Sequence, residues 1–375
     1  MHLLFLEPFY GGSHKDFADG LCRHSSHCIS LYTLPDRFWK WRMRGAALAF
    51  LRKIPYSETF DAIIMSNLMS AADFRALFPG QCPPLLVYFH ENQLSYPVAR
   101  EDERDMHFGF TDITTALAAD RVLFNSRTHS RDFFSQLPAF LRRMPDLQPL
   151  WAGDAIGAKS GVCYPGCAFS AESGDSAGTQ PGSVPLIVWN HRWEFDKQPE
   201  IFFAALEKAA EKDIPFTIGI LGEAGQTVPA VFDTARTRFG ERIRQFGGVA
   251  DKEEYFAWLQ NADVVVSTAI QENFGISVVE AMRFGCLPLL PDRLSYPEIL
   301  PARAHSTCLY GSFDELVARL CHMLTNLDNY TELRTELAAA MRFYAWQQRI
   351  SEFDREFADL AAGKRKSTGP RAQQL

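Results

Sequence analysis

Two carboxylates stand eight positions apart, at Glu272 and Glu280, on either side of a predicted junction between a loop and a helix. An apolar strand is predicted at residues 264–267, and the helix is predicted to begin near Ile276. Free amides at a helix start attract anions, and a carboxylate one turn further can accept hydrogen bonds from a ribose diol. We therefore assign this segment to a nucleotide-sugar donor: Glu272, Asn273, Phe274, Gly275, Ile276 and Glu280. A capping loop followed by a solvated helix glutamate is the structural alternative.

Two cations, Arg192 and Lys197, follow the first predicted strand of the second half of the chain. Arginine can bind a phosphate with two parallel hydrogen bonds from its planar guanidinium, and lysine acts as a point charge. Their place at the carboxyl end of a strand predicts that both aim at a diphosphate leaving group. Gly222, directly after the strand predicted at 217–221, is assigned to donor binding as well. The alternative is a pair of surface cations in a loop.

A glycine pair separates the first predicted strand from the first predicted helix. The Gly-x-Gly-x-x-Gly spacing of dinucleotide-binding proteins is missing here, and no acid lies directly at the end of the strand predicted at residues 28–33, which argues against a dehydrogenase. Backbone amides at such a turn can still meet a phosphate or a sugar. We assign Gly11, Gly12 and Ser13 to donor binding and His14 to the acceptor. A tight turn without a ligand is the alternative.

Four hydrogen-bonding residues, His90, Glu91, Asn92 and Gln93, directly follow the apolar strand predicted at residues 85–89. One histidine alone would more often be a satisfied structural residue, but such a polar succession after an apolar strand is hard to explain by packing. We expect it to bind sugar hydroxyls. Glu91, Asn92 and Gln93 are assigned to the acceptor, and His90 is assigned to the same sugar-binding group.

Six basic residues and no acid lie between Arg37 and Lys53, interleaved with aromatic rings. Bases of single-stranded or looped RNA stack on aromatic side chains while lysine and arginine bind the phosphates. We assign Trp39, Lys40, Trp41, Arg42 and Arg44 to RNA contact. The alternative is a helix that buries its aromatic stripe and turns its cations to water.

Short apolar runs alternate with longer amphipathic segments, which is the pattern of a parallel sheet covered on both faces. The first series of strands is predicted at residues 2–6, 28–33, 60–65, 85–89 and 121–124, and the second at 186–189, 217–221, 243–246, 264–267 and 287–290. The fold class is therefore α/β, with two Rossmann-like doubly wound domains in tandem. Their ligand is expected in a cleft outside the carboxyl ends of the strands.

The predicted boundaries follow changes in composition along the chain. An acceptor domain spans 1–168, a small, polar and turn-rich linker spans 169–184, and a nucleotide-sugar domain spans 185–345. Apolar residues on helical spacing predict a crossing helix at 346–362. A basic tail at 363–375 is expected to be frayed.

The composition excludes several classes of protein. With 375 residues, the chain is longer than a single hydrophobic core usually supports, so two domains are expected. With 47% hydrophobic residues, it is too apolar to be an intrinsically disordered protein. The net charge of -7 lies entirely in residues 169–375, so we expect a polyanion to bind to the first half of the chain. Eight scattered cysteines indicate reduced core thiols. No basic leader and no long apolar run are evident, so we expect a cytoplasmic protein without stable membrane association.

These motifs together resemble a known family. The acidic pair, Arg192 with Lys197, and the step Tyr164-Pro-Gly166 are similar to retaining GT-B glycosyltransferases of the type that contains many mannosyltransferases. Strings in the first half are similar to the tRNA-queuosine alpha-mannosyltransferase family: Pro8-Phe-Tyr-Gly-Gly-Ser-His-Lys15, Tyr32-Thr-Leu-Pro35, Trp39-Lys-Trp-Arg-Met-Arg44, Tyr88-Phe-His-Glu-Asn-Gln-Leu-Ser-Tyr-Pro97 and Phe124-Asn-Ser126. The resemblance covers residues 1 to about 345.

The resemblance implies transfer of mannose from GDP-mannose to the cyclopentenediol of queuosine in the anticodon of aspartate tRNA. It also implies retention of the anomeric configuration and no cofactor or obligatory metal. Glu272 would contact the donor sugar, Glu280 the ribose, Arg192 with Lys197 the diphosphate, and His90 the hexose. Gly12 would approach the diphosphate from the first domain.

Two other functions remain open at the level of the sequence. A GT-B enzyme with a lipid or polysaccharide acceptor would use the same second domain and could dock on a membrane through residues 37–53 as a basic amphipathic helix. A non-catalytic nucleotide-sugar sensor or RNA-binding module would keep the binding residues without transferring sugar. The spacing of the residues gives no indication of oligomeric state.

Overall fold

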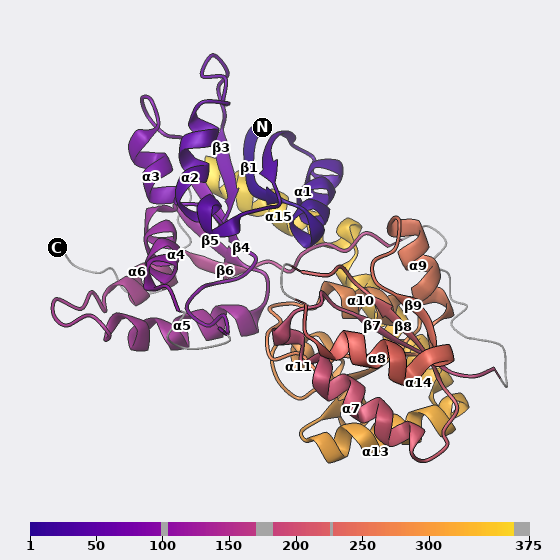
Figure 1. Ribbon diagram of the computed structural model, residues 1–375. Coiled ribbons are helices and arrows are strands. Elements are labelled where there is room, and N and C mark those ends of the chain that lie inside the picture. The colour runs from indigo at the N-terminus through magenta and orange to yellow at the C-terminus, as the bar shows by residue number, and fades with distance from the viewer. Residues whose placement is uncertain (99–103, 170–182, 226–227, 364–375) are drawn as a thin grey trace. The chain divides into compact units, whose positions relative to one another are not determined.

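The computed structural model describes residues 1–98, 104–169, 183–225 and 228–363. The chain divides into two compact units (Figure 1). The first comprises Met1–Gly166 together with the chain from Trp346 onward, and the second is Cys167–Ala345. Most of the linker predicted at 169–184 and almost all of the tail predicted at 363–375 lie outside the described residues.

The first unit is built on a parallel sheet of six strands in the order β2-β1-β3-β4-β5-β6. Its strands are β1 (His2–Tyr10), β2 (Cys28–Pro35), β3 (Ala62–Ser66), β4 (Leu85–Phe89), β5 (Arg121–Phe124) and β6 (Ser160–Val162). All five strands predicted for this half of the chain are confirmed. The sixth, β6, was not predicted because its three residues, Ser-Gly-Val, carry too little apolar pattern.

Alternate residues of each strand enter opposite cores of this unit. Leu4 and Leu6 of β1 pack on one face, which is covered by α2 (Trp39–Leu51), α3 (Ala71–Leu77), α4 (Met106–Ala118), α5 (Arg127–Leu141) and α6 (Ala152–Gly157). Leu3 and Phe5 pack on the other face, which is covered by α1 (Gly12–His24) and α15 (Trp346–Ala361). This two-residue period explains why the strands are apolar throughout.

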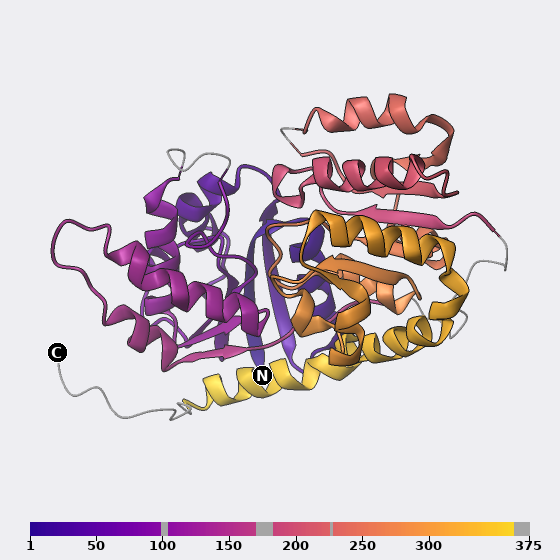
Figure 2. The ribbon, with the colours of Figure 1, turned by 90° about the horizontal axis from the view of Figure 1, so that it is seen from below.

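The C-terminal helix α15 belongs to the first unit, although it follows the second unit in the sequence. Trp346, Phe353, Phe357 and Leu360 are buried against α1 and the sheet. The yellow helix runs along this face in Figure 2. A buried ion pair between Arg121 and Glu356, 2.7 Å apart, fixes the helix to β5. The structure thus has the expected helix with its apolar stripe buried, while its crossing between the two domains stays a prediction.

The second unit carries a second parallel sheet of six strands, in the order β12-β11-β10-β7-β8-β9. Its strands are β7 (Leu186–Asn190), β8 (Thr217–Leu221), β9 (Ile243–Phe246), β10 (Val264–Val266), β11 (Leu287–Pro291) and β12 (Leu309–Tyr310). The five predicted strands are confirmed, and the two-residue β12 was too short to predict. The main helices of this unit are α7 (Pro199–Ala210), α8 (Val231–Phe239), α9 (Lys252–Asn261), α10 (Ile276–Arg283), α13 (Phe313–Thr325) and α14 (Thr331–Ala340).

Two further expectations concern cysteines and membranes. All eight cysteines are free thiols, and five of them are buried, as predicted for core residues. Among the described residues, none of the helices combines the length and the apolar character needed to cross a membrane.

Candidate functional site

The carboxyl ends of β7 and β10 bring the predicted donor residues of the second unit together. These strands are adjacent and parallel, so the segments that leave them meet at one edge of the sheet. A short 3-10 turn, Phe195–Lys197, follows β7, and the loop 267–275 connects β10 to α10. Lys197 and Glu272 come from these two segments, and their Nζ and Oε2 atoms lie 3.7 Å apart.

The Lys197 ammonium is enclosed by oxygens. Its Nζ donates to the carbonyl of Gln271 at 2.5 Å and lies 3.3 Å from Asp196 Oδ2. A lysine with 9% of its side chain exposed needs anionic partners, and these oxygens supply them. That Lys197 also aims its charge at a diphosphate stays a prediction. Asp196 is buried as well. In this structure Lys197 links Asp196 to Glu272.

Arg192 differs from Lys197 in exposure. Its side chain is 58% exposed, and Nη2 lies 3.3 Å from Glu194 Oε2. The neighbouring His191 is buried, which, with the charge of Lys197, lowers its pKa to about 3 and keeps it neutral. Gly222 has a φ of +137°, and a Cβ at this position would lie 2.0 Å from the His191 carbonyl oxygen. Gly222 therefore permits the close approach of β8 to the segment that carries Arg192.

The loop before α10 carries Phe274 and Gly275, whose amides the sequence analysis assigns to the donor. Gly275 is the N-cap with a φ of +95°, and no side chain caps the helix. Phe274 is buried and packs edge-on against Tyr344, with ring centroids 5.1 Å apart. Ser295 Oγ donates to the Phe274 carbonyl at 2.9 Å. Phe274 thus anchors the loop through its ring, while Asn273 and Ile276 are half-buried beside it.

Glu280 lies one turn inside α10, as predicted, but it is 3% exposed and already paired. Lys252 Nζ of α9 is 2.8 Å from Glu280 Oε1. Tyr255 also hydrogen-bonds to Glu280, and its pKa is raised well above the usual value by burial and by the charge of that carboxylate. Asn190 Nδ2, at the end of β7, donates to the Tyr255 hydroxyl at 3.0 Å. Lys252 and Tyr255 of α9 thus orient Glu280, and Asn190 of β7 orients Tyr255.

In the first unit, the carboxyl ends of β1, β3 and β4 bring Glu7, Ser66, His14 and His90 together. The Glu7 carboxylate is fully buried. Its Oε1 lies 3.1 Å from His14 Nδ1, and Ser66 Oγ donates to Oε2. The rings of His14 and His90 face each other with centroids 4.0 Å apart and a tilt of 33°. His14 therefore lies beside His90 and is only 7% exposed. Its assignment to the acceptor stays a prediction.

The glycine pair opens α1 beside this cluster. Gly11 is the N-cap, and no side chain caps the helix. Gly12 and Ser13 are exposed at its first turn. Amides in the first turn of a helix can meet an anion, and the assignment of Gly11, Gly12 and Ser13 to the donor stays a prediction.

The loop after β4 is held by polar contacts. The His90 amide donates to Asn67 Oδ1 at 3.1 Å, and Asn125 Nδ2 donates to the His90 carbonyl at 2.9 Å. Asn92 is fully buried, and its Oδ1 accepts from the amides of Leu94 and Ser95. The assignment of Asn92 to acceptor contact is therefore corrected, because its side chain closes the turn.

Glu91 and Gln93 are half-buried, and Gln93 Nε2 donates to Glu91 Oε1 at 3.2 Å. The Gln93 amide donates at 2.7 Å to Asp112 Oδ2, and Asp112 is fully buried in α4. Burial raises the pKa of Asp112 to about 8. Asp112 therefore fastens the loop after β4 to α4.

Glu7, His14 and His90 offer three possible metal-ligand atoms within 4.8 Å of one another. The carboxylate oxygens already accept hydrogen bonds from His14, Ser66 and the Phe9 amide. These hydrogen bonds hold Glu7 and His14 in place, and His90 joins them through the contact between its ring and that of His14.

The basic segment forms the start of α2. Trp41 is 77% exposed, and Phe38 before it is 59% exposed. Trp39 is half-buried against Phe108 of α4, with ring centroids 5.1 Å apart. Lys40 and Arg44 are exposed, whereas Arg42 donates from Nη2 to the Pro35 carbonyl at 3.2 Å. The structure therefore divides the predicted RNA-contact set into exposed residues and residues that also support the fold.

Comparison with known proteins matches both units. Residues 2–167 match the family model described as tRNA-queuosine alpha-mannosyltransferase N-terminal, and residues 176–339 match glycosyl transferases group 1. A tRNA-queuosine alpha-mannosyltransferase of Drosophila melanogaster is 36% identical over 329 residues, which are 85% of this chain and 86% of the relative. The chain belongs to the tRNA-queuosine alpha-mannosyltransferase family. It is therefore a glycosyltransferase.

Solved structures agree with the GT-B fold of this tRNA-queuosine alpha-mannosyltransferase family member. A sucrose-phosphate synthase from Thermosynechococcus elongatus superposes with a TM-score of 0.74 at 15% identity, covering 97% of this chain and 100% of that one. Anabaena HepE in complex with UDP and glucose gives a TM-score of 0.68 at 15% identity, covering 96% and 100%. The predicted α/β class and GT-B architecture are confirmed.

Several residues of this family member were not predicted for the site: Glu7, Asp196, Lys252 and Tyr255. A signal existed for Glu7, a carboxylate inside an apolar strand, and for Asp196, which adjoins Lys197. Lys252 and Tyr255 reach Glu280 through the packing of α9 on α10, and nothing in their local sequence indicates it.

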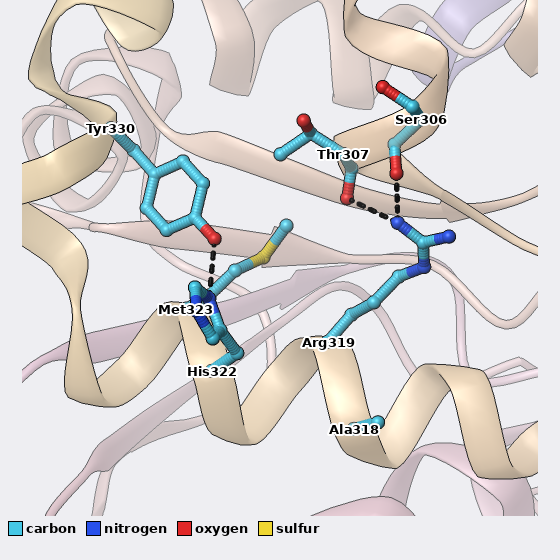
Figure 3. A pocket seen from close by; sticks show the side chains of 7 residues that line it. All are labelled: Ser306, Thr307, Ala318, Arg319, His322, Met323 and Tyr330. Atoms are coloured by element: carbon cyan, nitrogen blue, oxygen red, sulfur yellow. Dashed lines mark hydrogen bonds between the residues drawn. The ribbon is translucent and has the colours of Figure 1, made fainter.

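A separate pocket of about 310 Å³ lies near the amino ends of the strands of the second sheet (Figure 3). Arg319 donates there to the carbonyls of Ser306 and Thr307, and His322 Nδ1 is 2.7 Å from the Tyr330 hydroxyl. Because Ser306 and Thr307 precede β12, this pocket adjoins the amino ends of the strands and is distinct from the donor residues.

Proposed function

We propose that this protein transfers mannose from GDP-mannose to the cyclopentenediol of queuosine in the anticodon of aspartate tRNA. The anomeric configuration is retained, and no metal or other cofactor is required. The reaction takes place in the cytoplasm without stable membrane association. The observation that carries the proposal is the 36% identity to a tRNA-queuosine alpha-mannosyltransferase over 85% of the chain.

The donor half of the reaction belongs to the second unit. Breakage of the glycosidic bond produces an oxocarbenium-like sugar and a diphosphate, so stabilisation of the leaving charge dominates. Arg192 and the amides of Phe274 and Gly275 supply positive groups for the diphosphate. Lys197 adds charge and fixes Glu272, which contacts the hexose. Glu280 accepts hydrogen bonds from the ribose, and Gly222, Asn273 and Ile276 shape the surrounding surface.

The first unit supplies the acceptor side. His90 hydrogen-bonds the hexose at the reacting centre, with Glu91 and Gln93 beside the acceptor. Gly11, Gly12 and Ser13 meet the diphosphate through backbone amides. The exposed Trp41, Lys40 and Arg44 bind the RNA by stacking and by phosphate contact.

Retention follows from attack on the same face as the departing phosphate. A double displacement needs a carboxylate on the opposite face of the sugar, and the sequence offers no convincing one. The leaving phosphate oxygen therefore accepts the proton of the acceptor hydroxyl as the new glycosidic bond forms.

The test compares acceptors. The protein is incubated with GDP-mannose labelled in the sugar, in the presence of excess EDTA, with either queuosine-containing tRNA or lipid vesicles. Transfer to the tRNA at an undiminished rate supports the proposal. Transfer only to lipid supports the membrane alternative, and activity that needs added manganese contradicts the metal-independent mechanism.

A further inference from the structure

Glu7 is a buried carboxylate that none of the steps above uses. It lies near the carboxyl end of β1 with no solvent exposure. Its Oε1 accepts from the Phe9 amide at 2.9 Å and lies 3.1 Å from His14 Nδ1, while Ser66 Oγ donates to Oε2. Burial of a carboxylate costs several kcal/mol unless such partners are present. An apolar side chain would fill this position at lower cost.

The contact with Glu7 fixes how His14 lies. A carboxylate only accepts hydrogen bonds, so Nδ1 of His14 carries the proton that faces it. This bond selects both the tautomer and the rotation of the ring. The His14 ring then lies on the ring of His90, with centroids 4.0 Å apart.

His90 is held from the other side by its backbone. Asn67 and Asn125 bond its amide and its carbonyl, which fixes the start of the loop. Phe17 and Tyr88 contact the His90 ring edge-on, with centroids 4.9 Å away in both cases. The stack with His14 adds a contact on the face of the His90 ring, which restricts the plane that the ring can adopt.

We propose that Glu7 is a positioning residue that holds the His14 ring against His90 and thereby orients His90 toward the hexose. The assignment of His90 to the hexose rests on the proposed function. Glu7 acts through His14, so its removal and the removal of His14 have the same consequence for His90.

A double-mutant cycle tests this chain of contacts. Glu7→Met keeps a side chain of similar length without an acceptor, and His14→Leu removes the ring between Glu7 and His90. We expect each change to lower kcat with GDP-mannose and queuosine-containing tRNA about tenfold or more, with KM changed less than about threefold. The double variant should be no slower than either single variant, because the two residues act in series. A double variant whose kcat is lowered by the product of the two single-variant effects would overturn the proposal.

Three comparisons separate positioning from a purely structural role. Glu356→Met removes another buried, ion-paired carboxylate of the same unit, so it should lower the melting temperature and leave kcat unchanged. Glu7→Gln keeps an acceptor for His14 Nδ1, so it should fold and retain most of the turnover. The ring-proton shifts of His90, followed by NMR, should lose the stacking contribution in Glu7→Met and keep it in Glu7→Gln and Glu356→Met.

The NMR comparison does not depend on the proposed reaction. If the parent protein transfers no mannose, the proposed function fails, while the His90 shifts still report whether Glu7 holds the stack. Unchanged His90 shifts in folded Glu7→Met would overturn the positioning role even in an active enzyme.

Discussion

Lys197 Nζ lies 3.7 Å from Glu272 Oε2, and the same ammonium lies 3.3 Å from Asp196 Oδ2. The two carboxylates flank one buried cation at the edge of the second sheet. In the proposed reaction, a lysine in this position would stabilise the negative charge of the diphosphate and also fix the carboxylate assigned to the hexose. Arg192, whose side chain is 58% exposed, would have only the first of these roles.

Arg192→Ala is expected to lower kcat about a hundredfold with GDP-mannose, because the charge of Arg192 matters most as the diphosphate leaves. The melting temperature should hardly change, since the side chain is 58% exposed. The exposed Arg244 of β9 offers a matched control, and Arg244→Ala should leave kcat unaltered. Near-parental turnover in Arg192→Ala would remove Arg192 from the diphosphate site.

Lys197→Met is expected to lose turnover by a similar factor and also to lose stability. The change leaves the buried Asp196 carboxylate without its ion-pair partner, which costs about 3 kcal/mol or more. Chemical denaturation of the parent and the variant measures this loss. A variant as stable as the parent would mean that the ion pair does not form in solution.

Glu280→Gln is expected to weaken GDP-mannose binding by about 1.5 to 3 kcal/mol, because a charge-assisted acceptor for the ribose becomes a neutral amide. Tyr255→Phe should weaken binding in the same direction, since it removes a hydroxyl that orients Glu280. Calorimetric titration of the donor gives both dissociation constants. Values equal to the parent's would place Glu280 outside the ribose site.

The two tryptophans of α2 provide a paired test of the RNA face. Trp41→Ala should lower tRNA affinity without changing stability, because the ring is 77% exposed. Trp39→Ala should cost about 2 kcal/mol of stability, since it removes the ring that packs on Phe108.

Neutralising Arg37, Lys40 and Arg44 should flatten the salt dependence of tRNA binding by about one unit of slope for each phosphate that is no longer neutralised. An unchanged slope would move the RNA face elsewhere.

Asp112 is expected to set the stability of the first unit at mildly alkaline pH. Burial raises its pKa to about 8, above the unfolded value, so the folded state holds the proton more tightly. The stabilisation is complete below about pH 4 and declines as the pH rises toward 8, by up to about 1.4 kcal/mol per pH unit. Asp112→Asn cannot ionise and should be the more stable variant at pH 8.5. Equal loss of stability in both proteins between pH 6.5 and 8.5 would exclude this cause.

The sequence predicted the framework because strand periodicity is local. Val264 to Val266 and Leu85 to Phe89 are continuous apolar runs, and each is followed by polar residues where its strand ends. The site residues at those ends could therefore be named from the sequence. The three-residue β6 and two-residue β12 could not, because their order comes from pairing with β5 and β11.

The partners within the site could not be predicted for a related reason. Lys252 reaches Glu280 only because α9 packs beside α10, and Glu7 meets His14 only because α1 folds back on β1. Asn92 was assigned to the acceptor from its place after a strand, but in the structure its Oδ1 accepts hydrogen bonds from the backbone amides of Leu94 and Ser95. Sequence spacing identifies which residue types reach one edge of a sheet, while packing decides which of them pair.

The most direct measurement is mass spectrometry of the anticodon nucleoside after reaction with GDP-mannose. Two aspartate tRNAs are compared, one with queuosine and one with unmodified guanosine at the same position. The account predicts that only the queuosine nucleoside gains one hexose, and that Arg192→Ala slows this gain about a hundredfold. A hexose on the guanosine-containing tRNA, or none on either tRNA with the folded parent protein, would contradict it.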